Sequence, residues 1–176
     1  MITLERLGGL LNRDLVRVVY GKIVDANGEP YLTFMLSWIV LNHVYVTYCD
    51  QEPLPPGQQG DRKQLLHFAL HAEVTAARDA VLNSAGGSAR VQLPVTKRLR
   101  SGGREALVPR LGSKRVTASD FSCEEHFEVI YAIRNNVMHG DKAGISAVDM
   151  ANISFAAIHT RSLLEQIAFA ARVSLH

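Results

Sequence analysis

The sequence predicts an all-α protein, an up-and-down four-helix bundle with an additional helix and a long basic insertion loop. Three observations predict this fold. Apolar residues recur at spacings of three and four along most of the chain, which is typical of amphipathic helices. Short turn sequences separate these segments, and short links favour antiparallel helical neighbours. Residues 84–116 lack the helical period and are strongly basic. At 176 residues, we expect one domain over residues 1–176, with the basic insertion at 84–116.

Five helices are expected from the periodicity and its interruptions. Their predicted ranges are 3–24, 30–49, 61–83, 122–139 and 146–173. Pro30 suits the first position of a helix, and Asp61 can cap the third one. Ser122 and Glu125 fit a capping box. Gly140 is well placed to end the fourth helix.

The composition excludes several classes of protein. An apolar fraction of 47% and a charged fraction of 20% are incompatible with wholesale disorder. Cys49 and Cys123 are too few for a disulfide framework or a four-cysteine zinc site, so we expect a reducing, cytoplasmic compartment. The N-terminus does not resemble a secretory leader. The stretch 30–49 has no charged residue but contains Ser37 and Asn42, so we expect a buried bundle helix and no membrane partner.

The insertion at 84–116 carries the largest charge asymmetry of the sequence. It has eight basic residues and one acid, a net charge of +7, so the rest of the chain carries −5. One interpretation is a solvated loop. The other is an arm that follows a phosphate backbone, in which Lys97, Arg98 and Arg100 bind RNA.

One segment carries residues suited to chemistry, because it places Arg134, Asn135, Asn136 and His139 at the end of an apolar helix. Arg134 borders the buried face, where a charge needs a partner or an opening to water. Asn135 and His139 are four residues apart, so the amide can hold the imidazole. Arg134 and His139 lie about 140° apart around a straight helix. They converge only if the helix ends near His139 or if two copies pair along it.

These residues resemble a known family. Arg134-Asn135-Asn136-Val137-Met138-His139 resembles the Arg-x4-His motif of HEPN-domain proteins, and Trp38-x3-Asn42-x2-Tyr45 resembles a helix found in several branches of that family. Order and spacing agree over most of the chain outside 84–116. The resemblance implies a four-helix core that forms a homodimer. It also implies a metal-independent endoribonuclease site, with no cofactor, where the motifs of two subunits meet.

The chemistry implied by the resemblance suits the residues. Attack of the RNA 2′-OH on the adjacent phosphorus needs a proton acceptor, a proton donor and a cation. His139 would act as acid or base near neutral pH, and Arg134 would hold phosphate oxygens. Asn135 would orient the imidazole, and Asn136 would contact the substrate or the other subunit. The products would be a 2′,3′-cyclic phosphate or 3′-phosphate and a 5′-hydroxyl.

The resemblance further implies a toxin or phage-defence effector, with an antitoxin or regulatory protein as a partner. Toxin–antitoxin members of the family commonly have a tyrosine two residues after the histidine, a target for nucleotidylation. This chain has Asp141 there, so we do not expect regulation through that tyrosine. Two alternatives remain. The fold could serve as a catalytically inactive RNA- or protein-binding regulatory module, or Arg134 and His139 could merely cap a helix end.

Other candidate sites have less support. His67 and His71 are four apart, a spacing that can chelate a metal, but Glu73 is the only further ligand nearby, so we expect no metal. Cys123 and His126 suggest a thiol–imidazole pair without further support. The aromatic residues Phe34, Trp38 and Tyr45 are expected in the core.

Overall fold

The computed structural model describes all residues except 27, 99–101, 139–145 and 176, with Arg98 described by its backbone alone. The described part is mostly helical, with two small two-stranded sheets. The helices are α1 (Leu4–Gly8), α2 (Arg13–Asp25), α3 (Pro30–Gln51), α4 (Asp61–Ala69), α5 (Ala72–Leu82), α6 (Cys123–Met138) and α7 (Ala147–Ala170). The strands are β1 (Arg90–Gln92), β2 (Thr96–Arg98), β3 (Arg104–Ala106) and β4 (Arg115–Thr117).

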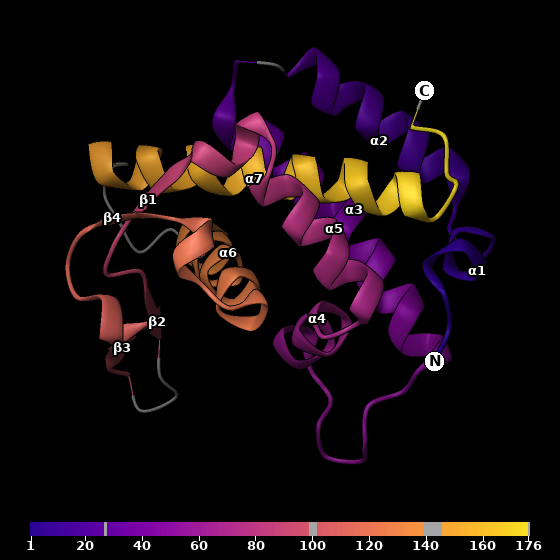
Figure 1. Ribbon diagram of the computed structural model, residues 1–176, viewed down its shortest axis with the longest axis horizontal. Helices are drawn as coiled ribbons and strands as arrows, with labels where there is room; N and C mark the ends of the chain where they lie inside the picture. The colour runs from indigo at the N-terminus through magenta and orange to yellow at the C-terminus, as the bar shows by residue number, and fades with distance from the viewer. Residues whose placement is uncertain (27, 99–101, 139–145, 176) are drawn as a thin grey trace.

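The helices α3 and α7 form the centre of the molecule and have the most extensive mutual packing (Figure 1). Both are apolar around most of their circumference, as expected for helices surrounded by other elements. Helix α2 packs on α3, and α5 packs on α7. Helix α4 contacts both α3 and α6. The phenol of Tyr20 on α2 also donates to Glu165 of α7 at 2.5 Å.

Helix α3 is long and apolar enough to span a membrane, a test that the core helix of a soluble protein also passes. Its most apolar window is 56% buried within the structure. The aromatic side chains of Phe34, Trp38 and Tyr45 are among those buried, as the sequence predicts.

The segment predicted as one helix over 3–24 is two helices, so that prediction is wrong. Helix α1 ends at Gly8, and α2 begins after Asn12, whose side chain accepts a hydrogen bond from Leu15 N at 3.0 Å. The backbone N–H of Asn12 donates to His43 Nε2 at 3.0 Å. The apolar spacing continues across the break because both helices pack on the same core, and this hides the break from a search for periodicity.

The predicted helix 61–83 is also two helices, α4 and α5, separated at Leu70 and His71. His71 caps α5, because its Nδ1 accepts from Glu73 N at 3.2 Å and its Nε2 donates to Ile2 O at 2.8 Å. His67 Nε2 donates to Glu52 O at 3.1 Å. Each imidazole therefore binds a backbone carbonyl, and both rings lie against Tyr48, with centroids 5.4 and 5.6 Å from its ring.

The other helix predictions agree with the structure. Helix α3 begins at Pro30, and α7 begins after Ser146. Ser122 and Glu125 form the predicted capping box at the start of α6, with hydrogen bonds of 3.1 and 2.8 Å in the two directions. The predicted helix stop at Gly140 lies outside the described residues.

The insertion 84–116 is not simply a loop. Strand β1 pairs with β4, and β2 pairs with β3, both antiparallel. The side chains of Val91, Leu93 and Val95 are buried. Gln92 and Asn152 of α7 exchange backbone–side-chain hydrogen bonds of 2.8 and 3.2 Å. These apolar and polar contacts attach the insertion to the helical core, beside α6 and α7 (Figure 1).

Candidate functional site

Three helices contribute side chains to the candidate site. Helix α3 supplies Trp38, Asn42 and Tyr45, which share one face because they are separated by four and three residues. Helix α4 supplies its first residue, Asp61, directly after Gly60. The φ of Gly60 is 132°, a backbone conformation that glycine adopts most readily. Helix α6 supplies the remaining side chains from its last two turns.

Arg134 lies against an aromatic ring and an amide. Its guanidinium carbon is 5.6 Å from the centroid of the Trp38 ring, a cation–π distance. Its Nη1 donates to Asn135 Oδ1 at 2.8 Å. Among the described residues, no carboxylate lies within ion-pair distance of this guanidinium, and its Nε is buried with no acceptor. The partners of Arg134 among the described residues are thus neutral groups.

Asp61 accepts two hydrogen bonds from helix α3. The hydroxyl of Tyr45 donates to its carboxylate, and Asn42 Nδ2 donates to it at 3.2 Å. Tyr131 of α6 lies near the same carboxylate, whose negative charge acts on its phenol. Burial and the bond to Asp61 raise the pKa of Tyr45, and burial also raises the pKa of Tyr131. Both phenols therefore stay protonated at neutral pH, and the Tyr45 hydroxyl donates to the carboxylate.

The rings of this cluster pack on Trp38. The Tyr45 ring centroid is 6.2 Å from that of Trp38, and the Tyr131 centroid is 5.9 Å away. These distances lie in the range at which aromatic pairs attract one another. Trp38 is thus in contact with both tyrosines and with Arg134, and it links the aromatic core to the polar site.

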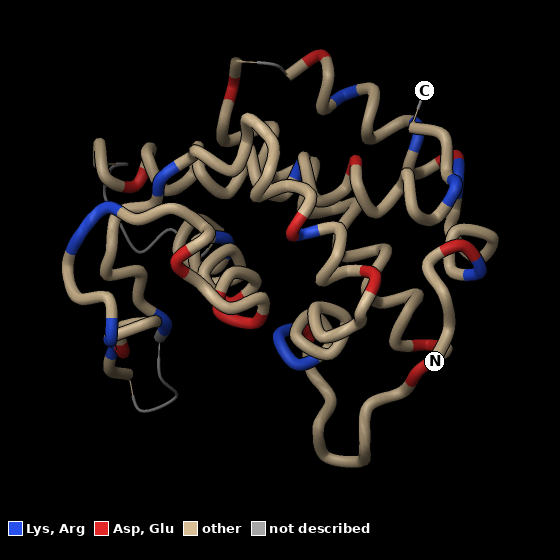
Figure 2. Tube along the Cα trace, in the orientation of Figure 1, with Lys and Arg blue, Asp and Glu red and all other residues tan. Residues whose placement is uncertain are grey.

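The basic insertion reaches this site through Asn136, whose Nδ2 donates to Thr96 O of β2 at 3.2 Å. The neighbouring Lys97 forms an ion pair of 3.1 Å with Glu105 across the hairpin of β2 and β3. Among the insertion's other cations, Arg104 and Lys114 are exposed. Figure 2 shows several Lys and Arg positions along this part of the trace.

The structure brings together only some of the predicted site residues. Arg134 and Asn135 are in direct contact, and Asn136 joins the same helix end to the hairpin. His139 and Arg100 lie outside the described residues, as does the side chain of Arg98. The predicted support of the His139 imidazole by Asn135 therefore stays a prediction.

Asp61 and Tyr131 are site residues that the sequence pattern did not reveal. The pattern gives Asp61 only a capping role, and Tyr131 only a place in an apolar helix. Tyr131 stands three residues before Arg134 and four before Asn135, so its position on the same face was open to recognition. Nothing in the sequence indicates that the start of α4 lies against this face, since that depends on how three helices pack.

The thiol–imidazole pair is not formed. The Cys123 thiol donates to Ala69 O at 3.4 Å, and burial raises its pKa, which disfavours the reactive thiolate. His126 is fully buried and lies beside His159, with ring centroids 4.8 Å apart. Across the described residues, no group of three or more His, Cys, Asp or Glu side chains could hold a metal.

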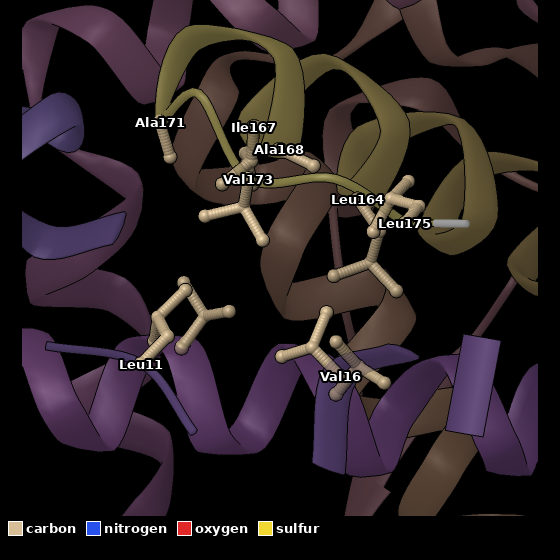
Figure 3. A pocket seen from close by; sticks show the side chains of 10 residues that line it. Leu11, Val16, Leu164, Ile167, Ala168, Ala171, Val173 and Leu175 are labelled. Atoms are coloured by element: carbon tan, nitrogen blue, oxygen red, sulfur yellow. The ribbon is translucent and has the colours of Figure 1, made fainter. Parts of the chain in front are cut away.

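Two pockets lie away from these residues. One is a cavity of about 10 Å³ between α2, α3, α7 and the C-terminal segment, lined by apolar side chains such as Leu11, Val16 and Val173 (Figure 3). A space of this size holds at most one water, and its walls offer no polar partner. The other, about 320 Å³, lies between the start of α3 and α7 and includes Arg161, which is paired with Glu165 at 3.0 Å.

No family model, curated protein or solved structure matches this chain. Arg134 is a partly buried cation with no carboxylate partner in the described part of the chain, and the sequence of its helix continues to a histidine.

Proposed function

We propose that this protein is a HEPN-like, metal-independent endoribonuclease that acts as a cytoplasmic homodimer, in a toxin or phage-defence setting. The observation that carries the proposal is the state of Arg134. Its guanidinium is held by Asn135 and Trp38 and has no carboxylate partner among the described residues. A cation in a partly buried place without a counter-ion is suited to bind an anionic group.

The proposed reaction is cleavage of RNA by its own 2′-OH. The hydroxyl oxygen attacks the adjacent phosphorus, the bond to the 5′-oxygen breaks, and a 2′,3′-cyclic phosphate and a 5′-hydroxyl result. Arg134 stabilises the added negative charge on the phosphoryl oxygens. His139 exchanges protons with the attacking or leaving oxygen, for which an imidazole is suited near pH 7.

The location of the insertion supports RNA as the substrate. Residues 84–116 carry a net charge of +7, and β2 is tied to α6 two residues after Arg134 through Asn136 and Thr96. A basic surface beside the proposed scissile phosphate would hold neighbouring phosphates of the strand. In this arrangement Asn136 positions the hairpin, and Lys97, Arg98 and Arg100 contact the substrate.

The decisive experiment compares the purified protein with its His139→Ala variant on single-stranded RNA, with EDTA present. We expect the wild-type protein to yield cyclic-phosphate ends, and the variant to lose at least about 100-fold in rate. The variant should keep the melting temperature and oligomeric state of the wild type. Equal cleavage by both proteins would contradict the proposal, as would loss of activity on chelation alone.

The alternative is a catalytically inactive module that uses the same fold to bind RNA or a regulatory protein. Its outcome in the same experiment is distinct. The wild-type protein would bind RNA and yield no cyclic-phosphate ends, and His139→Ala would change neither result.

A further inference from the structure

Helix α3 has an apolar face at the surface of the molecule. No Asp, Glu, Lys or Arg lies between Glu29 and Asp50. On this helix, side chains that are exposed or half-buried repeat at spacings of three and four, so they share one face. They are Leu32, Met35, Leu36, Ile39, His43 and Val46, and we term them the α3 stripe. Leu32 and Ile39 are each 46% exposed. A contiguous apolar face at a protein surface is typical of an interaction site.

Other exposed apolar side chains in the described helices do not form such a face. Val148 and Met150 are two residues apart, so they point to different sides of α7. Phe169 is 84% exposed, but its helical neighbours at the preceding turn, Glu165 and Gln166, are polar. Single exposed apolar residues of this kind are ordinary. The α3 stripe is therefore the surface that calls for a partner.

The α3 stripe borders the candidate site. Asn42, which donates to Asp61 at 3.2 Å, stands three residues after Ile39 and four before Val46, at the edge of the stripe. The next side chain around the helix toward the core is Trp38, whose ring lies 5.6 Å from the guanidinium carbon of Arg134. A partner seated on the stripe would thus reach the edge of the candidate site.

The chemistry of the stripe suits a second copy of this chain. In a two-fold contact the same surface of both copies meets, so a charged face would repel itself. The α3 stripe has no Asp, Glu, Lys or Arg that could do so. Its one polar side chain, His43, already accepts a hydrogen bond from Asn12 N at 3.0 Å. Burying the stripe against its own copy therefore removes apolar surface from water without stranding a charge.

A lipid surface suits the stripe less well. Helices that lie on membranes carry Lys and Arg beside their apolar face, whereas α3 has none, and acidic residues flank it at Glu29, Asp50 and Glu52. A helix that crossed the membrane would have to leave the core, in which Trp38 and Tyr45 are buried.

We propose that the α3 stripe is the apolar centre of a homodimer interface whose two-fold axis passes near Ile39. Ile39 is the midpoint between Leu32 and Val46, so antiparallel pairing places it against the partner's Ile39. Helices that cross at about 50° diverge at their ends, which keeps the acidic flanks apart. The stripe is about 21 Å long, and a stable dimer buries about 800 Å² per copy. The polar surroundings, including the candidate site, would therefore form the rim. This inference rests on the proposed function only for the part that the dimer plays in cleavage.

A cysteine at the axis tests the geometry. Ile39→Cys places two thiols close together in the dimer, and Phe169→Cys is the control with an exposed thiol outside the stripe. Of the native cysteines, Cys49 is buried and Cys123 is bound to a backbone carbonyl. A short bis-maleimide should join most of the Ile39→Cys chains into pairs and leave most Phe169→Cys chains single. Equal cross-linking of the two variants, or none in Ile39→Cys, would overturn the inference.

A charge at the axis tests the energetics. Analytical ultracentrifugation should show a dimer for the wild type and for Phe169→Glu. In Ile39→Glu two like charges meet, so the dimer dissociation constant should rise at least about 100-fold, with a melting temperature close to that of the wild type because residue 39 is half exposed. A monomeric wild type, or an Ile39→Glu variant that stays a dimer, would overturn the inference. So would a wild-type monomer that sediments with vesicles of phosphatidylcholine and phosphatidylglycerol, which would make lipid the occupant.

RNA cleavage separates this inference from the proposed function. If both hold, Ile39→Glu loses cleavage together with the dimer, and Phe169→Glu keeps both. A wild-type dimer that Ile39→Glu dissociates, but that does not cleave RNA, would contradict the proposed nuclease and support the interface. A wild-type protein that cleaves RNA as a dimer resistant to Ile39→Glu would overturn the interface alone.

Discussion

Two buried histidines form a second polar feature of the core, apart from the candidate site. His126 and His159 have no exposed surface, and in the described part of the chain none of their ring nitrogens has a hydrogen-bond partner. Burial and then the nearby Arg78 lower the pKa of His159 to about 4. Burial, followed by His159 and Arg78, lowers the pKa of His126 well below its usual range. Both imidazoles are therefore neutral in the folded protein at pH 7.

This pair predicts a loss of stability in mild acid. The folded pKa of each histidine lies below the roughly 6.5 of the unfolded chain, so below pH 6.5 the unfolded chain binds more protons. The stability contributed by the neutral pair is complete above about pH 6.5 and is lost as the pH falls, at about 1.4 kcal/mol per pH unit for each histidine. Urea unfolding between pH 5 and 7 measures this slope.

The variant His159→Leu provides the control, because it removes one of the two titrating groups from the core. Its free energy of unfolding should depend on pH about half as steeply as that of the wild type over the same interval. Identical slopes in the two proteins would show that the buried histidines do not cause the acid sensitivity.

At the scale of elements, the contact between α1 and the end of α7 depends on a glycine. A Cβ on Gly8 would lie 2.2 Å from the carbonyl oxygen of Ala171 and 2.9 Å from the Val173 side chain. We expect Gly8→Ala to destabilise the protein by about 1–3 kcal/mol, since backbone atoms would have to move. Chemical unfolding measures the difference.

Gly21, in the middle of α2, is the matched position, because a Cβ there meets no atom within 4 Å. Gly21→Ala should stabilise the protein by about 0.5–1 kcal/mol, as alanine loses less backbone entropy in a helix. Destabilisation of both variants to the same extent would contradict the close approach of α1 to α7.

The hairpin of β2 and β3 is the element proposed to hold RNA beside Arg134. Replacing Lys97, Arg98 and Arg100 together with Gln should weaken RNA binding. It should also reduce the salt slope, by about 0.7 for each phosphate of a single strand that the variant no longer neutralises. Fluorescence anisotropy at several salt concentrations measures both quantities.

The control for the hairpin variant makes the same change of charge elsewhere. Arg6, Arg13 and Arg17 are exposed on α1 and α2, and α1 lies at the opposite end of the molecule from the hairpin (Figure 1). Their replacement with Gln should leave the salt slope nearly unchanged. An equal effect of both triple variants would mean that RNA responds only to net charge, and that the hairpin is a solvated element.

At the scale of the whole molecule, the proposed site requires two copies of the chain. If Arg134 of one copy and His139 of the other act on the same phosphate, a dimer of one Arg134→Ala chain and one His139→Ala chain retains one intact site. Random mixing should then restore about a quarter of the wild-type activity, because half of the dimers are mixed and each has one working site.

This complementation is measured after the two inactive variants are unfolded and refolded together. Each variant refolded alone should stay inactive. Mixed dimers that form and remain inactive would contradict a site shared between subunits, and would place both groups within one copy.

The sequence determined the helical class of this protein and most of its helix ends, because capping residues such as Ser122 and Ser146 and the proline at position 30 act locally. It also singled out Arg134 and Asn135, since charged and amide residues at the end of an apolar helix stand out by their cost of burial. The breaks at residues 9–12 and 70–71 escaped prediction, because apolar spacing continues across them and because the contacts that fix Asn12 and His71 come from distant segments.

Only the tertiary structure decided what surrounds Arg134. Asp61 and Tyr131 are 70 residues apart in the sequence, and both come to lie against side chains of α3 because of how α4 and α6 pack. The insertion likewise adopts paired strands because the side chains of Val91, Leu93 and Val95 are buried in the hydrophobic core. The side chain of Asn136 also binds the backbone of β2. Hydrogen bonds between remote side chains depend on helix packing, and packing is settled by the shape of the whole core.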